Sequence, residues 1–495
     1  MIPRMKSWGR GWLGGLVWAW AVAVSGQAAA PLRLHPDNPH YFLWRGRPTV
    51  LITSGEHYGA VLNRDFNYVR YLDTLAAGGL NLTRTFSGAY VEPDGAFRIA
   101  RNTLAPEAGR LICPWARSDT PGYRGGGNKF DLTRWDTAYF ARLKDFVTQA
   151  SRRGVVVEFT LFCPMYGGKQ WVLSPMNAIN NINGAGTVAR TNVYTLDRNG
   201  GLLPFQEALA RKVVTELRDA DNVIYEICNE PYFGGVTLAW QRHIAEVIAA
   251  TERKWGVRHL ISRNVANGHA RVRNPSPLVS VFNFHYASPP VAVAENYALN
   301  KVIGDNETGF RGTADLPYRI EAWNFILAGG GLFNHLDYSF TVGHEDGTFA
   351  YPPTQPGGGN AGLRRQFRAL KRFIEGFDFV RMRPDTAVVI GGVPQGYTVR
   401  GLTEPGRAWA LYLSRDASLK PDPQSPPARP LRITLELAVP AGRYQVTWWN
   451  PAAARAGAPR TVRVSSRGLA LSSPEFRDDI ALAVRRVKKT APEGK

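Results

Sequence analysis

The chain has 495 residues, 44% of them hydrophobic, and only three cysteines. It is long enough to bury a large core, and at most one internal disulfide can form, which excludes a fold held together by a disulfide framework. The formal net charge is +20. Arginines dominate this charge and are scattered rather than clustered, which argues against a nucleic-acid partner, whereas an anionic polysaccharide or cell-envelope ligand stays open.

The first 29 residues have the pattern of a secretory signal peptide. Three basic residues among the first ten precede an apolar run over residues 11–24 and a small-residue stretch over residues 25–30. This order predicts cleavage after Ala28 or Ala29, with an uncleaved anchor as the alternative. No later segment approaches the length of a membrane span. We therefore expect a bacterial protein that is secreted or periplasmic, without stable membrane insertion after cleavage.

Short apolar runs alternate with amphipathic helical segments from residue 49 onward, which is the pattern of βα units on a parallel sheet. Eight strands predict an α/β fold, a (β/α)8 TIM barrel over residues 30–382. A doubly wound sheet would need fewer strands and a phosphate-binding glycine turn, which we do not find. The predicted strands are 49–53, 80–85, 155–162, 223–228, 259–262, 279–284, 302–304 and 331–335. The predicted helices are 65–77, 135–152, 204–219, 237–255, 317–328 and 363–377, and the link between the fifth and sixth strands has no clear helix.

Two long insertions, residues 87–132 and 164–202, follow the second and third strands. They are rich in glycine, asparagine, proline and aromatic residues. Loops that follow barrel strands lie at the C-terminal face, where active sites form, so we expect these insertions to wall the mouth of a site.

Helical signals disappear after about residue 383, and alternation of period two begins. This predicts a small all-β domain over residues 383–495, an antiparallel sandwich in which the proline-rich segment 421–430 is a loop. Its predicted strands are 386–390, 409–414, 431–437, 443–449, 461–464 and 480–484.

Two glutamates, Glu226 and Glu230, stand in the otherwise apolar stretch NVIYEICNEP. In an extended strand they share one face, with Asn229 on the other, and lie roughly 13 Å apart, so they cannot have the same role. A buried carboxylate is costly alone, so we expect Glu226 inside the barrel, paired with a cation or other donors. Glu230 should lie at the C-terminal rim.

A second rim acid, Glu307, stands in the seventh strand and its end, VIGDNETG, where Asp305 is an alternative. Acids at the ends of strands four and seven face each other across the barrel. There one can protonate a leaving oxygen while the other attacks a sugar carbon. Glu230 would then need a raised pKa to act first as an acid and later as a base.

These two motifs resemble those of the glycoside hydrolases of clan A, the barrel superfamily that includes family 5 cellulases. The resemblance covers about residues 40–380. It implies that Glu230 is the acid/base, that Glu307 is the nucleophile and that Asn229 bonds the sugar 2-hydroxyl.

The resemblance also implies substrate-binding roles for Arg84, at the end of strand two, and for His285 and Tyr286 on strand six. Independently of the resemblance, Arg84 and the Tyr286 hydroxyl near Glu307 would favour its charged form and so keep the nucleophile ionised.

Further substrate contacts are predicted outside these motifs. The segment TSGEHY and its lead-in FLWRGRP look like those of exported bacterial clan A enzymes with a C-terminal β-sandwich. We expect Glu56 and His57 to contact the substrate, with a structural role as the alternative. Trp171, in the second insertion, is expected to stack on a sugar ring, with loop packing as the alternative. The clan usually ends strand eight in a tryptophan, but here the corresponding segment offers Asp337.

The sequence therefore predicts an exported retaining glycoside hydrolase that cleaves β-glycosidic bonds in oligo- or polysaccharides. The alternative is a non-catalytic carbohydrate-binding protein on the same barrel. We find no phosphate loop, zinc-protease motif or nucleophile elbow, and expect no cofactor and no metal. We expect a monomer whose partner is its carbohydrate substrate.

Overall fold

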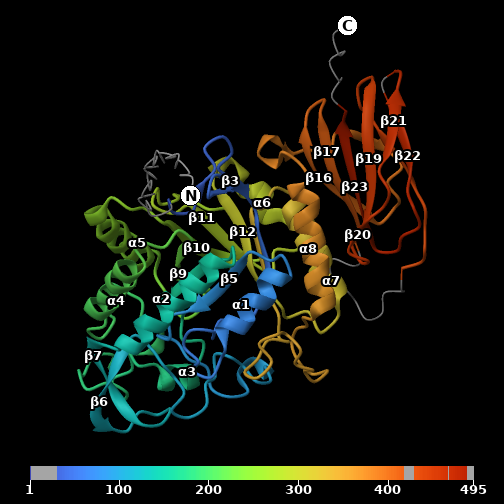
Figure 1. Ribbon diagram of the computed structural model, residues 1–495. Coiled ribbons are helices and arrows are strands. Elements are labelled where there is room, and N and C mark those ends of the chain that lie inside the picture. Colours follow the sequence, from blue (N-terminus) through green and yellow to red (C-terminus); the bar gives the residue numbers. More distant parts are fainter. Residues whose placement is uncertain (2–29, 417–427, 467, 488–495) are drawn as a thin grey trace.

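The computed structural model describes residue 1 and residues 30–416, 428–466 and 468–487 (Figure 1). The predicted signal peptide and most of the predicted loop 421–430 lie outside the described residues. Among the described residues, no helix combines the length and the apolar character that crossing a membrane requires.

Eight parallel strands form one curled sheet, which confirms the predicted (β/α)8 barrel (Figure 1). In sheet order they are β4 (Leu51–Gly55), β13 (Leu332–Leu336), β12 (Val302–Thr308), β11 (Val281–His285), β10 (Leu260–Asn267), β9 (Val223–Cys228), β8 (Val156–Phe162) and β5 (Leu82–Phe86). The larger helices are α1 (Tyr68–Ala77), α2 (Thr137–Arg152), α4 (Leu203–Glu216), α5 (Leu238–Glu252), α7 (Asp315–Leu327) and α8 (Ala361–Glu375). The β10–β11 link has no helix, as predicted.

The six-residue helix α6 (Val291–Asn296), between β11 and β12, was not among the predicted helices. It is too short to produce a helical period in the sequence.

The Asn81 side chain joins β4 and β5, the two edges of the curled sheet. Its Nδ2 donates to the Val50 carbonyl at 2.9 Å, and its Oδ1 accepts the Ile52 N–H at 3.0 Å. The amide therefore takes the place of a strand neighbour and satisfies backbone groups that would otherwise be unpaired.

An N-terminal sheet of three short strands packs against the end of the barrel where the barrel strands begin. The strands are β1 (Arg33–Leu34), β2 (Phe42–Trp44) and β3 (Arg47–Thr49). Phe42 and Trp44 join one apolar cluster with a buried residue from each barrel strand, namely Leu51, Leu82, Val156, Ile224, Leu260, Val281, Val302 and Leu332. This apolar layer closes the end of the barrel that is remote from the strand C-termini, which leaves the other end for chemistry.

The two insertions carry structure of their own. The first forms the hairpin β6 (Trp115–Pro121) and β7 (Asn128–Trp135), and the second contains α3 (Gly168–Leu173). The two are joined where the Phe130 N–H donates to the Asn180 carbonyl at 2.8 Å. The insertions therefore support each other beside the barrel.

The C-terminal part is all β, as predicted. One sheet has the order β14 (Arg383–Pro384), β16 (Tyr397–Glu404), β17 (Ala408–Arg415), β23 (Asp479–Arg486), β19 (Gly442–Asn450) and β20 (Arg455–Ala456), with β21 (Arg460–Val464) also on β19. The other sheet is β15 (Val389–Gly391), β18 (Thr434–Leu437) and β22 (Leu469–Ser472). Apolar residues of both sheets form one core. The predicted strands did not include β16, which is only half buried along its first four residues and carries a glycine.

Helices α7 and α8 stand between the barrel and the β-sandwich (Figure 1). The Trp323 ring of α7 stacks on Tyr412 of β17, with ring centroids 5.2 Å apart. Nearby, the Arg319 guanidinium binds both carboxylate oxygens of Asp479 at 3.0 Å, and both side chains are buried. The Tyr412 hydroxyl also donates to Asp479, at 3.0 Å. The sandwich therefore covers barrel surface with an aromatic contact and a buried ion pair.

Replacing Asp479 by alanine should destabilise the protein by about 3–5 kcal/mol, because it leaves the Arg319 charge buried without its partner. Urea unfolding followed by tryptophan fluorescence measures the change. Glu404→Ala, which breaks a more exposed pair with Arg407, is the matched control and should cost less than about 1 kcal/mol. Equal losses in the two variants would contradict a stabilising role for the buried pair.

Candidate active site

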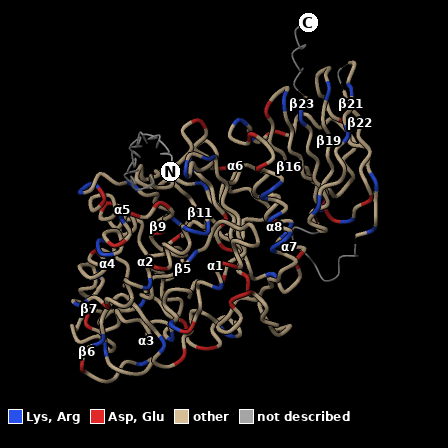
Figure 2. Tube along the Cα trace, viewed as in Figure 1, with Lys and Arg blue, Asp and Glu red and all other residues tan. Residues whose placement is uncertain are grey.

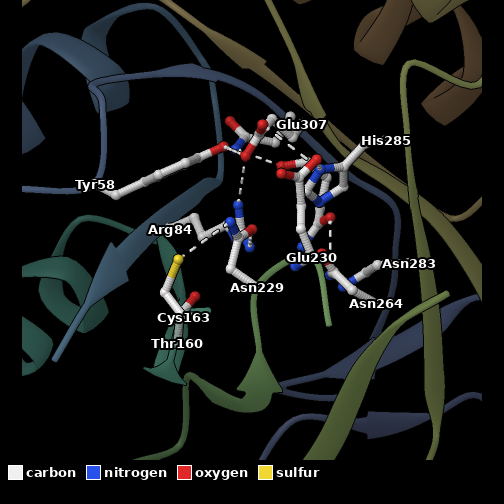
Figure 3. Close-up of polar contacts among 12 residues, drawn as sticks. Tyr58, Arg84, Thr160, Cys163, Asn229, Glu230, Asn264, Asn283, His285 and Glu307 are labelled. Atoms are coloured by element: carbon white, nitrogen blue, oxygen red, sulfur yellow. Dashed lines mark hydrogen bonds and ion pairs between the residues drawn. The ribbon is translucent and has the colours of Figure 1, made fainter. Parts of the chain in front are cut away.

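A cavity of about 380 Å³ opens at the C-terminal ends of the barrel strands. Its lining includes Asn229, Glu230, Tyr286 and Glu307. The predicted rim residues of strands four, six and seven are therefore brought to one place. Arg84 and His285 are not among the lining residues, but they contact the two glutamates (Figure 3): Arg84 contacts Glu307 and His285 contacts Glu230.

Arg84 of β5 is the central cation of the site. It is fully buried, and its Nε and Nη2 donate to Glu226 at 2.8 and 2.6 Å. Its Nη1 donates to Glu307 at 3.1 Å, and Nη2 also donates to the Asn229 side-chain oxygen at 2.6 Å. Burial lowers the pKa of Arg84, but the charges of Glu226 and other neighbours outweigh this and raise it. One guanidinium on β5 thus fixes residues of two other strands, β9 and β12.

Glu226 lies inside the barrel and pairs with a cation, as the sequence predicts. Besides Arg84, it accepts hydrogen bonds from Thr160 at 2.5 Å, Asn264 at 2.5 Å and Asn306 at 2.7 Å. A buried carboxylate with this many donors has its desolvation cost offset.

Glu158 of β8 completes the buried polar layer. It accepts hydrogen bonds from Ser262 and Asn283 at 2.7 Å each and from Asn306 at 3.0 Å. Burial and the charge of Glu226 raise its pKa. A raised pKa favours the neutral acid and limits the negative charge that Arg84 must balance.

Glu307, at the end of β12, accepts hydrogen bonds from three groups. Besides Arg84, the Tyr58 hydroxyl donates at 3.0 Å to Oε2 and the Tyr286 hydroxyl donates at 2.7 Å to Oε1. A cation and two hydroxyl donors hold the orientation of this carboxyl group. Arg84 and Tyr286 were predicted here. Tyr58 ends the quoted segment TSGEHY, but no role was predicted for it.

Glu230 is surrounded by other donors. The His285 Nδ1 lies 3.0 Å from its Oε1, the Tyr166 hydroxyl donates at 2.5 Å and the Tyr232 hydroxyl donates at 3.3 Å. Burial raises the pKa of Glu230, but the hydrogen bond and charge of His285 and then the tyrosines outweigh it, so the pKa is lowered. The expected raised pKa of Glu230 is therefore wrong for this structure.

The group that shares a proton with Glu230 is the imidazole of His285, whose Nδ1 lies 3.0 Å away. Burial lowers the pKa of this imidazole, but the charge of Glu307 and the contact with Glu230 outweigh burial and raise it. Its Nδ1 also lies 3.5 Å from Glu307. Two groups this close titrate together, so the proton belongs to the Glu230 and His285 pair.

Three site residues have a positive φ where the chain leaves a strand. The values are 63° for Tyr58, 32° for Glu230 and 54° for Tyr286. Such values are uncommon outside glycine and cluster where function fixes the backbone. The turn at Glu230 also explains the position of Asn229, which the sequence predicts on the opposite face of the strand from Glu230. The regular strand and its alternation of side chains end at Cys228, and Asn229 and Glu230 both line the cavity.

The register of β12 shifts between Asp305 and Thr308. As a result two consecutive residues, Asn306 and Glu307, face the barrel interior, while Asp305 accepts the Ala287 N–H at 3.2 Å. Burial, followed by the charge of Glu321, raises the pKa of Asp305 well above its usual range. Asp305, the alternative to Glu307, is not among the residues that line the cavity.

Three further predicted contacts are not among the lining residues. Glu56 accepts the N–H groups of Gly59 and Ala60 at 2.9 Å each, so it closes a turn, and burial raises its pKa to about 7. Trp171 is buried and donates to a backbone carbonyl at 3.2 Å. Asp337 forms a buried ion pair with Arg364 at 2.6 Å.

His57 does line the cavity. It lies beside Glu92, a cavity residue from the first insertion that the sequence analysis did not identify. This acid reaches the site only because the insertion folds back over the barrel. No local sequence pattern predicts that folding.

Glu230, His285 and Glu307 also form the one group, within the described residues, whose ligand atoms could hold a metal, all lying within 4.8 Å of one another. Arg84 and tyrosine hydroxyls already partner these carboxylates, and the Arg84 charge would oppose a bound cation.

Comparison with solved structures identifies similar folds. A Bacteroides vulgatus structure has a TM-score of 0.62 and 14% identity, covering 93% of this chain and 83% of that one. A glycoside hydrolase family 5 structure from the same species has a TM-score of 0.58 and 14% identity, covering 92% and 93%. A glycoside hydrolase has a TM-score of 0.59 and 15% identity, covering 93% and 98%. No family model and no curated protein sequence matches the chain. At these identities the likeness establishes the fold.

Replacing Glu226 by glutamine should lower stability by about 3 kcal/mol, because Arg84 loses a buried counter-charge. Chemical unfolding of the purified variant measures this. Glu230→Gln, the same change four residues along the chain, should leave the unfolding midpoint nearer that of the wild type. A Glu226→Gln variant as stable as the wild type would contradict the role given to the buried pair.

Proposed function

We propose that the protein is an exported retaining glycoside hydrolase that cleaves β-glycosidic bonds in oligo- or polysaccharides. The observation that carries the proposal is the pair of rim carboxylates, one bonded to a fixed cation and the other to a proton donor. The fold shared with glycoside hydrolase structures supports it. Export is proposed on the N-terminal pattern of residues 1–29.

The nearest oxygens of the two carboxyl groups are close enough for double displacement. Ligand oxygens of Glu230 and Glu307 lie within 4.8 Å of each other. Retaining glycosidases hold their carboxyl groups about 5–5.5 Å apart, and inverting ones about 6.5–9.5 Å, to make room for a water. A close pair leaves the second carboxylate able to attack the sugar carbon directly.

In the first step, Glu307 attacks the anomeric carbon while the leaving oxygen takes a proton at Glu230. Hydrogen bonds from Arg84, Tyr58 and Tyr286 hold Glu307 in position for this attack. The proton moves from the Glu230 and His285 pair to the leaving oxygen. As the bond to the sugar forms, Glu307 loses its charge, which removes the largest cause of the raised pKa of His285. Glu230, now a base, then activates the water that releases the sugar.

Aromatic side chains at the mouth suit a carbohydrate. Phe97, Phe233 and Phe310 line the cavity, and each remains about two-fifths exposed. The faces of pyranose rings are apolar, so such rings can stack on them. Lys and Arg residues are spread over the barrel and the sandwich among acidic residues (Figure 2), which does not favour an anionic polymer in particular.

Glu307→Gln should reduce turnover of aryl β-glycosides by at least about 10⁴-fold, because no nucleophile remains. The variant should still fold, because Arg84 keeps its buried pair with Glu226. A screen of aryl glycosides and polysaccharides, with product stereochemistry read by NMR, measures this in the wild type and the variant. Glu226→Gln, tested at a temperature where it is folded, is the matched control and should retain more activity.

An inverted product would contradict double displacement. Undiminished turnover by Glu307→Gln would contradict the nucleophile assignment. Binding of glycans without hydrolysis across the whole panel would favour the carbohydrate-binding alternative.

The alkaline limb of the pH profile should depend on His285. The pKa of His285 is raised, so the shared proton is kept at pH 6.5 and lost as the pH rises through that raised value. In His285→Asn the proton must reside on a carboxyl group alone, so the fall in kcat/KM should move to lower pH. His269→Asn, a change at a more exposed histidine, is the control and should leave the profile unchanged. An unchanged alkaline limb in His285→Asn would contradict the shared proton.

A further inference from the structure

The cavity contains a third carboxylate besides the two rim glutamates. Glu92, from the first insertion, lines it together with His57, and the His57 Nε2 lies 3.7 Å from a Glu92 oxygen. Both residues are buried, with Glu92 4% and His57 8% exposed. No hydrogen bond recorded among the described residues ties either side chain to Glu230 or Glu307. The steps proposed above therefore make no use of this pair.

Glu92 is held firmly by its own loop. The Tyr90 hydroxyl donates to its Oε1 at 3.0 Å, Asn102 Nδ2 donates to its Oε2, and the Glu92 N–H donates to the Leu104 carbonyl at 2.9 Å. A carboxylate has about four acceptor positions, so these bonds leave positions open on a side chain that faces the cavity. Burying a charge is costly, and a fixed, buried acid at the wall of a site suits ligand binding better than loop folding.

The neighbours of the pair indicate which part of a glycoside it meets. Tyr58, next to His57 in the chain, donates to Glu307, the side of the cavity where the anomeric carbon would be attacked. Tyr166 and Tyr232 donate to Glu230, where the leaving group would be protonated. His57 and Glu92 therefore lie toward the sugar that is transferred, the glycone.

Charge at the cavity wall limits the kind of sugar. The lining residues include three carboxylates, Glu92, Glu230 and Glu307, and no lysine or arginine. Burial lowers the pKa of His57, but the hydrogen bond and charge of Glu92, with the charge of Glu307, outweigh it and raise the pKa. Arg84 and His285 contact the rim acids from beneath, so with His57 three basic side chains face four acids, Glu92, Glu226, Glu230 and Glu307. A glycone that carries a carboxylate would add to this excess of acids and meet repulsion.

We infer that Glu92 and His57 bind hydroxyl groups of the glycone and select a neutral sugar over a uronic acid. The inference rests on the proposed glycosidase function and adds the substrate class. A carboxylate accepts two neighbouring hydroxyls well, and a site built to bond a hydroxyl rejects analogues that lack it.

Kinetics of Glu92→Gln with aryl β-glycosides of neutral hexoses and of glucuronic acid test this inference. The substitution keeps the shape and removes the charge, so kcat/KM for the best neutral glycoside should fall about 10- to 100-fold. For a deoxy analogue that lacks the bonded hydroxyl, wild type and variant should differ by less than about threefold. Glu107→Gln, at an exposed position of the same insertion, is the matched control and should match the wild type on every substrate.

Two results would overturn the inference while leaving the glycosidase function intact. One is equal activity of wild type and Glu92→Gln on all glycosides, and the other is a preference of the wild type for the glucuronide. If Glu92→Gln fails to fold, as judged by its melting curve, His57→Gln replaces it with the same expected outcomes.

Failure of the proposed function gives a different pattern. If the wild type hydrolyses no glycoside, calorimetric titration decides the inference. The same aryl β-glycosides of neutral hexoses and of glucuronic acid are titrated into Glu307→Gln, with and without Glu92→Gln. Binding of a neutral glycoside that is lost with Glu92→Gln supports it. Equal binding by the two proteins, or tighter binding of the glucuronide, overturns it.

Discussion

The ion pairs of Arg84 are the interaction on which the rest of the site depends. A guanidinium buried at the centre of a barrel is stable only with acids around it, and here it lies between Glu226 and Glu307. Glu226 is shielded from the cavity, whereas Glu307 is exposed to it. The Arg84 charge therefore offsets the cost of burying Glu226 and also fixes the position of Glu307. Stability and chemistry share one cation, so a change at Glu226 acts on both.

The way the strands end gives the site its shape. A regular strand sends alternate side chains to opposite faces, so it can present only every second residue to the cavity. Positive φ angles at Glu230 and Tyr286 and the register shift in β12 let consecutive residues reach the same place. In this way Asn229 joins Glu230, and Asn306 can bond the buried acids while Glu307 faces the cavity. This local strain is held by the hydrogen-bonded layer beneath it.

Each of the two rim acids has its own set of donors. Glu307 is bonded to a permanent cation, while Glu230 is bonded to a histidine whose charge depends on its neighbours. A lowered pKa at Glu230 and a raised pKa at His285 describe one proton held between two groups. The negative charge of Glu307 holds that proton nearby, so the state of one carboxylate sets the protonation of the other.

The sequence alone determined the order of the eight barrel strands and of the larger helices between them, because buried parallel strands and amphipathic helices have distinct hydrophobic periods that need no tertiary information. It also predicted Glu230 and Glu307 at the ends of strands four and seven, Glu226 as a buried paired charge, and Arg84 and Tyr286 beside Glu307. Only the tertiary structure decided the rest. Glu92 reaches the cavity because a long insertion folds back, Glu56 bonds Thr103 and Asp337 bonds Arg364. The pKa of Glu230 follows from a histidine 55 residues away. These outcomes depend on contacts between distant segments and on the burial those contacts create, and neither can be read from local sequence pattern.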